Sequence, residues 1–88
     1  MTNRTTLRRH ADLVDRMATT LGLDLEELAM TGQLRIDTVG DAVLACTGCS
    51  NPHGCEHWMA QQDGVVAEPP QICRNREMFA ELKAGKSV

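Results

Sequence analysis

The chain has 88 residues with one Phe, one Trp and no Tyr, so we expect a single domain, 1–88, with a small apolar core. Its net charge of −3 is uneven, +2 over residues 1–16, −7 over 17–73 and +2 over 74–88, and the acidic middle argues against nucleic-acid binding. There is no long apolar run, which argues against a membrane span or a signal peptide and favours a cytoplasmic protein.

The first predicted element is an amphipathic helix over residues 7–21, ended by Gly22. Its apolar positions recur at helical spacing: Leu7, Ala11, Val14, Ala18 and Leu21, with His10 and Met17 beside them. Asp24, followed three residues later by Glu27, has the pattern of a capping box and predicts a second, short helix. That helix is expected to bury Leu25, Leu28 and Ala29. The first two predicted helices together resemble a helix-turn-helix. The second helix, however, has acidic and no basic side chains, which argues against DNA binding.

A third helix is predicted with Asp37 as its candidate cap. Its apolar stripe is Ile36, Val39, Val43 and Cys46. The helix leads into the cysteine loop, 46–55. Here Cys46 and Cys49 form a C-x2-C pair, which brings two thiols to one side of a tight turn, and Gly48 can adopt the backbone angles that such a turn requires.

Asn51 and Pro52 predict the start of a fourth helix, with Asn51 as its cap and Pro52 in its first position. Cys55 then falls in the first turn, where the helix dipole favours a thiolate. His53 and His57 have the H-x3-H spacing of some zinc sites, so Cys46, Cys49, His53 and His57 form a minor alternative ligand set. The two histidines lie roughly 160–200° around the helix from Cys55, and a solvated face is the favoured interpretation.

A returning loop is predicted over 63–72, because it contains the turn signal Asp63-Gly64 and the extended pair Pro69-Pro70. This loop must carry the chain back to deliver Cys73. A final helix is predicted over about 75–84, with Asn75 as its cap. Residues 86–88 are expected to fray as a tail.

The four cysteines are predicted to be the ligands of a metal centre. They are Cys46, Cys49, Cys55 and Cys73, spaced C-x2-C-x5-C-x17-C. A small core makes a staple physically reasonable, and in the cytoplasm C-x2-C pairs indicate metal or redox chemistry. Structural zinc sites usually combine two C-x2-C pairs, whereas iron–sulfur proteins often combine a compact cysteine run with one remote cysteine. We therefore favour a [4Fe–4S] cluster over zinc, and we expect an all-α domain of about five short helices around the four-cysteine centre.

A cluster would make the chain a redox sensor or an electron-transfer accessory protein, and zinc would make it a structural interaction module. Disulfides or packed thiols are the alternative to any metal. A thiol–disulfide enzyme built on Cys46 and Cys49 is a lesser alternative, because the helix end at Cys46 opposes a thiolate. No catalytic set of side chains stands out, so we expect no enzyme. The charge pattern favours docking to a protein partner, and we expect a monomer.

Three motifs carry a resemblance to a known group of proteins. They are the C-x2-C loop Cys46-Thr47-Gly48-Cys49, the Cys-x2-Trp helix Cys55-Glu56-His57-Trp58 and the Cys-x-Asn segment Cys73-Arg74-Asn75. With an N-terminal helical segment before them, the chain resembles a family of small alphaproteobacterial proteins over roughly residues 10–83. That family usually has Pro at the position of Arg74, which bears on the start of the final helix and not on the ligands. The resemblance implies an all-helical fold with a shared four-cysteine site.

Overall fold

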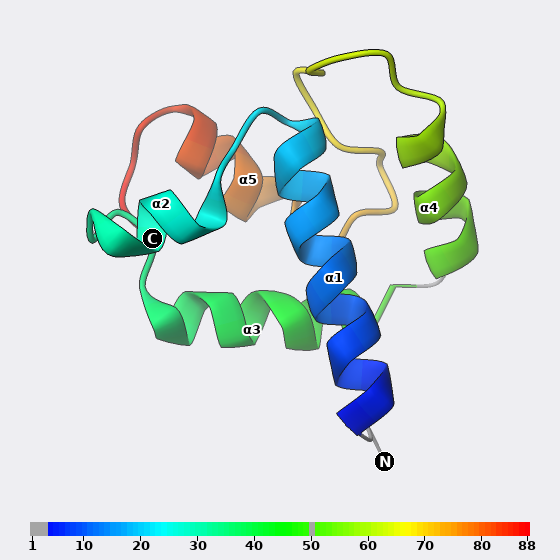
Figure 1. Cartoon of the computed structure of the whole chain (residues 1–88), viewed down its shortest axis with the longest axis horizontal. Helices are drawn as coiled ribbons and strands as arrows, with labels where there is room; N and C mark the ends of the chain where they lie inside the picture. Colours follow the sequence, from blue (N-terminus) through cyan, green and yellow to red (C-terminus); the bar gives the residue numbers. More distant parts are fainter. Residues whose placement is uncertain (1–3, 50) are drawn as a thin grey trace.

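The computed structural model describes residues 4–49 and 51–88, and these residues form five helices and no strand. The helices are α1 (Arg4–Thr20), α2 (Leu25–Met30), α3 (Ile36–Thr47), α4 (Pro52–Ala60) and α5 (Arg76–Lys83) (Figure 1). The predicted all-α class with about five short helices is therefore confirmed. None of the helices in this part of the chain is long and apolar enough to cross a membrane.

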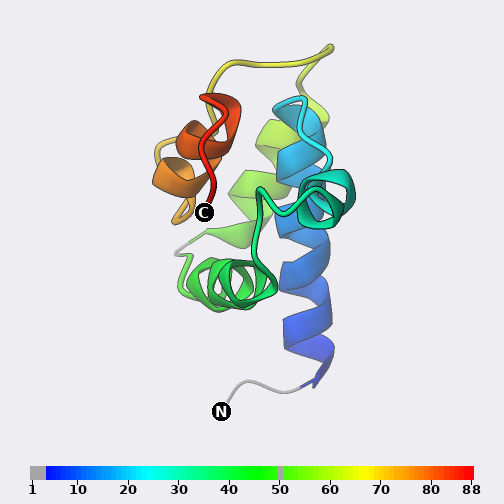
Figure 2. The ribbon, with the colours of Figure 1, turned by 90° about the vertical axis from the view of Figure 1, so that its left-hand side faces the viewer.

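The first helix, α1, stands at the centre of the fold. α3 crosses it and α4 lies beside it, as two perpendicular views show (Figure 1, Figure 2). One face of α1 supplies most of the core, because its buried side chains recur at the three- and four-residue spacing of a helix. They are His10, Leu13, Val14, Met17, Ala18 and, just beyond the helix, Leu21. The other helices complete this core with Ala42, Cys55, Met59 and Phe79.

Two expectations about the core are corrected. The buried face of α1 is rotated from the predicted one, since Leu13 is buried and Ala11 is exposed. The larger side chains decide the rotation because they remove more apolar surface from water. The prediction that the helices are arranged around a four-cysteine centre is also wrong. Only Cys55 among the cysteines is fully buried, the other three are partly exposed, and the fold is organised around α1.

The starts of α2 and α4 are capped as predicted. The Asp24 carboxylate accepts a hydrogen bond from the Glu27 N–H (3.2 Å), and the Asn51 side-chain oxygen accepts one from the Gly54 N–H (2.9 Å). Each bond satisfies an N–H group that the first turn of a helix leaves without a partner. α2 contributes no fully buried side chain. Leu25 packs against the core from its edge, and Leu28 and Ala29 are half-buried.

The start of α3 differs from the prediction. The helix begins at Ile36, directly after Arg35, and no side chain caps it. The Val39 N–H donates to the Arg35 carbonyl (3.2 Å), which begins the helical hydrogen bonding earlier than a cap at Asp37 would allow. Asp37 lies in the first turn, where its charge is still favourable to the helix dipole.

The tail after α5 does not fray as predicted. The Val88 N–H donates to the Gln33 carbonyl and the Val88 carbonyl accepts from the Arg35 N–H, each at 2.9 Å. The Gln33 side chain also donates to the Lys86 carbonyl (3.1 Å). The tail is therefore paired with the segment between α2 and α3.

Lys83, the last residue of α5, ties three segments together. Its ammonium group donates to the Leu21 carbonyl, just beyond α1 (2.9 Å), and to the Val66 carbonyl in the returning loop (3.1 Å). The Val66 N–H in turn donates to the Thr20 carbonyl (3.0 Å). One positive charge thus satisfies carbonyl groups at the end of α1 and in the loop that passes over it.

Replacing Lys83 with Met should lower the free energy of unfolding by about 1–2 kcal/mol, because two carbonyl groups lose a charged donor while the aliphatic stem is kept. Urea unfolding followed by circular dichroism measures the change. Lys86→Met is the matched control, since within the described residues the Lys86 side chain makes no hydrogen bond. An equal loss in the two variants would contradict this role of Lys83.

Candidate metal centre

Cys46 and Cys49 lie on the turn that ends α3. The Gly48 N–H donates to the Ala45 carbonyl and the Cys49 N–H to the Cys46 carbonyl, both at 3.0 Å. Gly48 has a φ of −84°, which any residue can adopt, so it is not required for its backbone angles as predicted. The missing side chain matters instead, because a Cβ at this position would lie only 3.3 Å from the Ala45 carbonyl oxygen.

Cys55 lies in the first turn of α4. It is buried in the same core cluster as Ala42 and Met59. The Asn51 cap fixes this turn, and Gly54 leaves the room that the cap needs, because a Cβ on Gly54 would collide with the Asn51 side chain. The local sequence around Asn51 therefore positions Cys55 through the cap.

Asn75 brings Cys73 back to α3. Its side-chain amide donates a buried hydrogen bond to the Ala42 carbonyl (2.9 Å), and Ala42 lies about one helical turn before Cys46. Asn75 occupies the N-cap position of α5 as predicted, but its side chain forms no capping hydrogen bond. Asn75 is only 7% exposed, so its amide must find a partner inside the protein, and the partner is α3.

A second contact joins the returning loop to Cys49. The Cys49 thiol donates a long hydrogen bond to the Ile72 carbonyl, with an Sγ–O distance of 3.9 Å. The Cys73 N–H donates to the Pro70 carbonyl (3.0 Å), which forms the turn that presents Cys73. The residue before Cys73 thus contacts Cys49, and the remote cysteine is delivered to the end of α3.

The thiols influence one another's ionisation. Burial first, and then the neighbouring cysteines Cys49, Cys55 and Cys73, raise the pKa of Cys46 to about 11. Burial, followed by Cys73 and Cys49, raises the pKa of Cys55 to about 11. Burial also raises the pKa of Cys73, although a hydrogen bond from the Asn75 backbone opposes the rise. The thiolate predicted at Cys55 is therefore not favoured, because burial outweighs the helix dipole.

The four cysteines share one region without closing on one point. All four are free thiols. In residues 4–49 and 51–88, no three His, Cys, Asp or Glu side chains form a group that could hold a metal ion. The alternative set with His53 and His57 is not assembled either, since both histidines are exposed and the His57 ring lies against Gln61 (3.2 Å). The thiol donors thus come from three segments, and they would have to move to surround a metal.

The sequence placed Asn75 correctly at the start of α5 but did not reveal the partner of its side chain, the Ala42 carbonyl. A signal was present in the Cys-x-Asn motif, because a polar amide beside an apolar helix must be either solvated or bonded. To decide whether the Asn75 amide is solvated or bonded, one must know which carbonyl group lies next to it in the fold. Trp58 is half-buried and packs against the core cluster.

Replacing Asn75 with Ala should release the segment that carries Cys73. We expect a loss of about 1–3 kcal/mol in the free energy of unfolding, because the Ala42 carbonyl loses its buried donor. Cys73 should also react faster with iodoacetamide, measured by peptide mass mapping. Asn51→Ala is the matched control, since it removes a cap of comparable energy but leaves Cys73 in place. Unchanged reactivity of Cys73 in Asn75→Ala would show that the bond from Asn75 to the Ala42 carbonyl does not hold Cys73 in place.

The metal-free protein should lose stability as the pH rises from 9 to 11. In the unfolded chain the cysteines ionise near a pKa of 9.0, whereas folded Cys46 and Cys55 ionise at about 11. The contribution of these thiols to the free energy of unfolding is fully present below pH 9. It is lost as the pH rises through 11, because the unfolded state releases protons that the folded state keeps. Melting temperatures in reducing buffer measure the effect. Cys46→Ser should show a shallower decline, and an identical decline would count against the raised pKa of Cys46.

A family model matches residues 1–85, and the chain belongs to that family, a family of unknown function (DUF6455). No curated protein and no solved structure matches the chain. The chemistry of the cysteine region therefore has to carry the functional conclusion.

Proposed function

We propose that this member of DUF6455 is a small non-enzymatic protein that binds a metal centre through Cys46, Cys49, Cys55 and Cys73. We favour a [4Fe–4S] cluster that serves redox sensing or electron transfer in the cytoplasm, where free thiols persist. The observation that carries the proposal is the bond from the Asn75 amide to the Ala42 carbonyl, which returns the one remote cysteine to the helix that ends in the C-x2-C pair.

The donor chemistry suits a metal that takes thiolates. The cysteines are free, so no disulfide consumes them. Metal binding removes the thiol protons, and the positive charge of the bound group would offset the mutual repulsion that helps to raise the pKa of Cys46 and Cys55. A Cys73 thiolate would keep its hydrogen bond from the Asn75 backbone, and bonds of this kind tune the potential of a cluster.

The supply of thiols from three separate segments favours a cluster over a single zinc ion. Four thiolates on zinc must all lie about 2.3 Å from one point. A cubane cluster offers each cysteine its own iron and therefore accepts a wider cage. The cysteines of this fold are near enough to affect one another's ionisation but do not form a closed metal-holding group.

Structural zinc is the second candidate. The tight turn from Cys46 to Cys49 has the C-x2-C spacing that zinc sites use. Zinc would cross-link α3, α4 and the returning loop, and would support a surface for a protein partner. A thiol–disulfide function has weaker support, because a Cys46 pKa of about 11 leaves little thiolate at neutral pH.

The surroundings would shield a cluster on one side only. Cys55 and Met59 belong to the buried core, and Trp58 packs against it. The turn from Cys46 to Cys49 is partly exposed, which leaves an approach for a redox partner. When bound, a cluster supplies one-electron redox chemistry, and its potential responds to this mixture of apolar cover and solvent.

We infer that the three motifs form the shared site of the small alphaproteobacterial proteins that the chain resembles. Each motif has a physical part in the site: the C-x2-C loop supplies two thiols on one turn, and the Cys-x2-Trp helix places a buried thiol beside apolar cover. The Cys-x-Asn segment supplies the remote thiol and the amide that anchors it to Ala42.

Anaerobic expression with excess iron should yield a brown protein with broad absorbance at about 400 nm that dithionite bleaches. Serine at any of the four cysteines should abolish or strongly reduce the cluster. The double variant His53→Gln, His57→Gln is the matched control and should keep it. Iron and acid-labile sulfide analysis, together with native mass spectrometry, measures the content of each variant.

Two results would decide against this choice. Colourless protein that holds stoichiometric zinc under the same conditions would replace the cluster with zinc. Protein that binds neither metal, and whose mass is lower by two protons for each disulfide formed, would reject the metal centre itself.

A further inference from the structure

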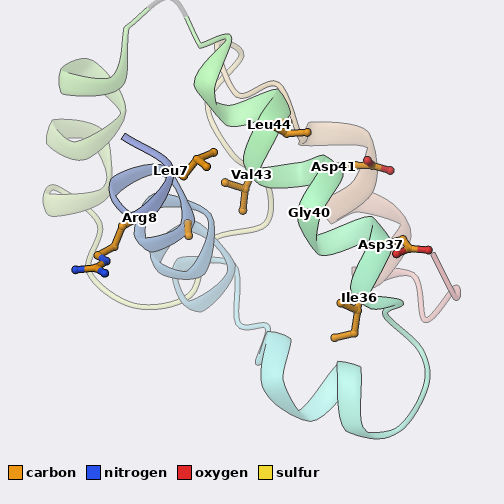
Figure 3. Close-up of a pocket in the computed structure, with 9 residues that line it drawn as sticks. Leu7, Arg8, Ile36, Asp37, Gly40, Asp41, Val43 and Leu44 are labelled. Atoms are coloured by element: carbon orange, nitrogen blue, oxygen red, sulfur yellow. The ribbon is translucent and has the colours of Figure 1, made fainter. Parts of the chain in front are cut away.

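An open apolar groove of about 880 Å³ lies between α1 and α3. Figure 3 shows Leu7 of α1 and Val43 of α3 pointing toward one another across it, with Leu44 and Ile36 toward the two ends of α3. The groove is open because Ala11 and Gly40, which also line it, have little or no side chain.

Two large apolar side chains of this groove are left in water. Ile36 is 75% exposed and Leu44 is 57% exposed. Both lie on α3, and neither belongs to the core cluster, in which Ala42 is buried and against which Val43 packs, so the core does not cover them. Apolar surface of this kind on a small protein marks an interaction site. The groove is also open along its length, whereas small-molecule pockets enclose most of their ligand. A protein surface therefore fits it better.

The two rims of the groove carry opposite charges. Asp37 and Asp41 lie on α3 and Arg8 lies on α1, and Figure 3 shows the two carboxylates and the guanidinium pointing outward on opposite sides. All three side chains are exposed, and none forms an ion pair with another of the described residues. The apolar floor is thus bordered by a negative rim and a positive rim.

We propose that this groove is the interface of a symmetric homodimer, in which two copies of the chain pack groove against groove. In a two-fold dimer, every contact from one residue to another is repeated in reverse. With the axis along the groove, the positive rim of each copy faces the negative rim of the other. Arg8 then meets Asp37 and Asp41 twice, and the apolar wall on α3, with Ile36 and Leu44, packs against the apolar wall on α1 of the other copy. The dimer takes the place of the monomer expected from the sequence.

Sedimentation velocity over a concentration series tests the proposal, with dimer formation expected for the wild type. Leu44→Glu should weaken association about a hundredfold, because it places a charge at an apolar contact. Arg8→Glu and Asp41→Arg should each weaken it about tenfold, since each reversal creates like-charge contacts twice. Asp63→Arg is the matched control, because Asp63 is exposed in the returning loop and does not line the groove. Circular dichroism shows whether each variant keeps its helices.

Mixing the two charge variants gives the sharpest result. In a dimer of one Arg8→Glu copy and one Asp41→Arg copy, positions 8 and 41 pair opposite charges at both crossings, and the only new repulsion is one contact between position 8 and Asp37, so the mixture should recover most of the wild-type association. The double variant should recover it as a homodimer. A wild-type chain that remains monomeric throughout the series would overturn the proposal and leave the groove to another partner. A dimer that neither Leu44→Glu nor the charge reversals weaken would place the interface elsewhere and overturn it as well.

Discussion

Burial of one face of α1 is the constraint on which the rest of the structure depends. The side chains from Leu13 to Leu21 form the surface against which the other helices pack. Each large apolar side chain buried there contributes roughly 1.5–3 kcal/mol, which is a large part of the small net stability of a domain this size. Three of the four cysteines lie at the margin of this core. The core therefore positions them, and they do not organise the core.

Polar contacts attach the second half of the chain to that core. Asn75, Lys83 and Val88 each donate a hydrogen bond to a carbonyl group from the first half. A single contact of this kind contributes about 1 kcal/mol, so the segment with Cys73 is held in place but can still adjust. Such a balance suits the proposed centre, because the thiols must move to bind a metal. The groove between α1 and α3 is made by rigid helices and involves none of these contacts.

Local signals predicted most of the fold, and distant partners account for what they missed. The caps at Asp24 and Asn51 depend on residues three positions away, so short patterns were sufficient for α2 and α4. The partner of Asn75 is 33 positions away, so the motif revealed a polar residue without revealing what it binds. Ile36 is exposed because a different face of α3 packs on the core, and the apolar stripe predicted for this helix does not specify which of its members are buried. The spacing of the cysteines likewise indicated four possible ligands but not how far apart the fold holds them.

The polar contacts of residues 73–88 also bear on how the protein is made. A ribosome releases a chain from its N-terminal side onward, and parts of a fold can form before the remainder emerges. The thiols of Cys46, Cys49 and Cys55 therefore leave the ribosome before Cys73 and the amide that anchors it. Until those later residues emerge, the three early thiols lack the fourth thiol of the proposed centre. The order of synthesis thus leaves an interval in which three of the four proposed ligands have emerged and the fourth has not.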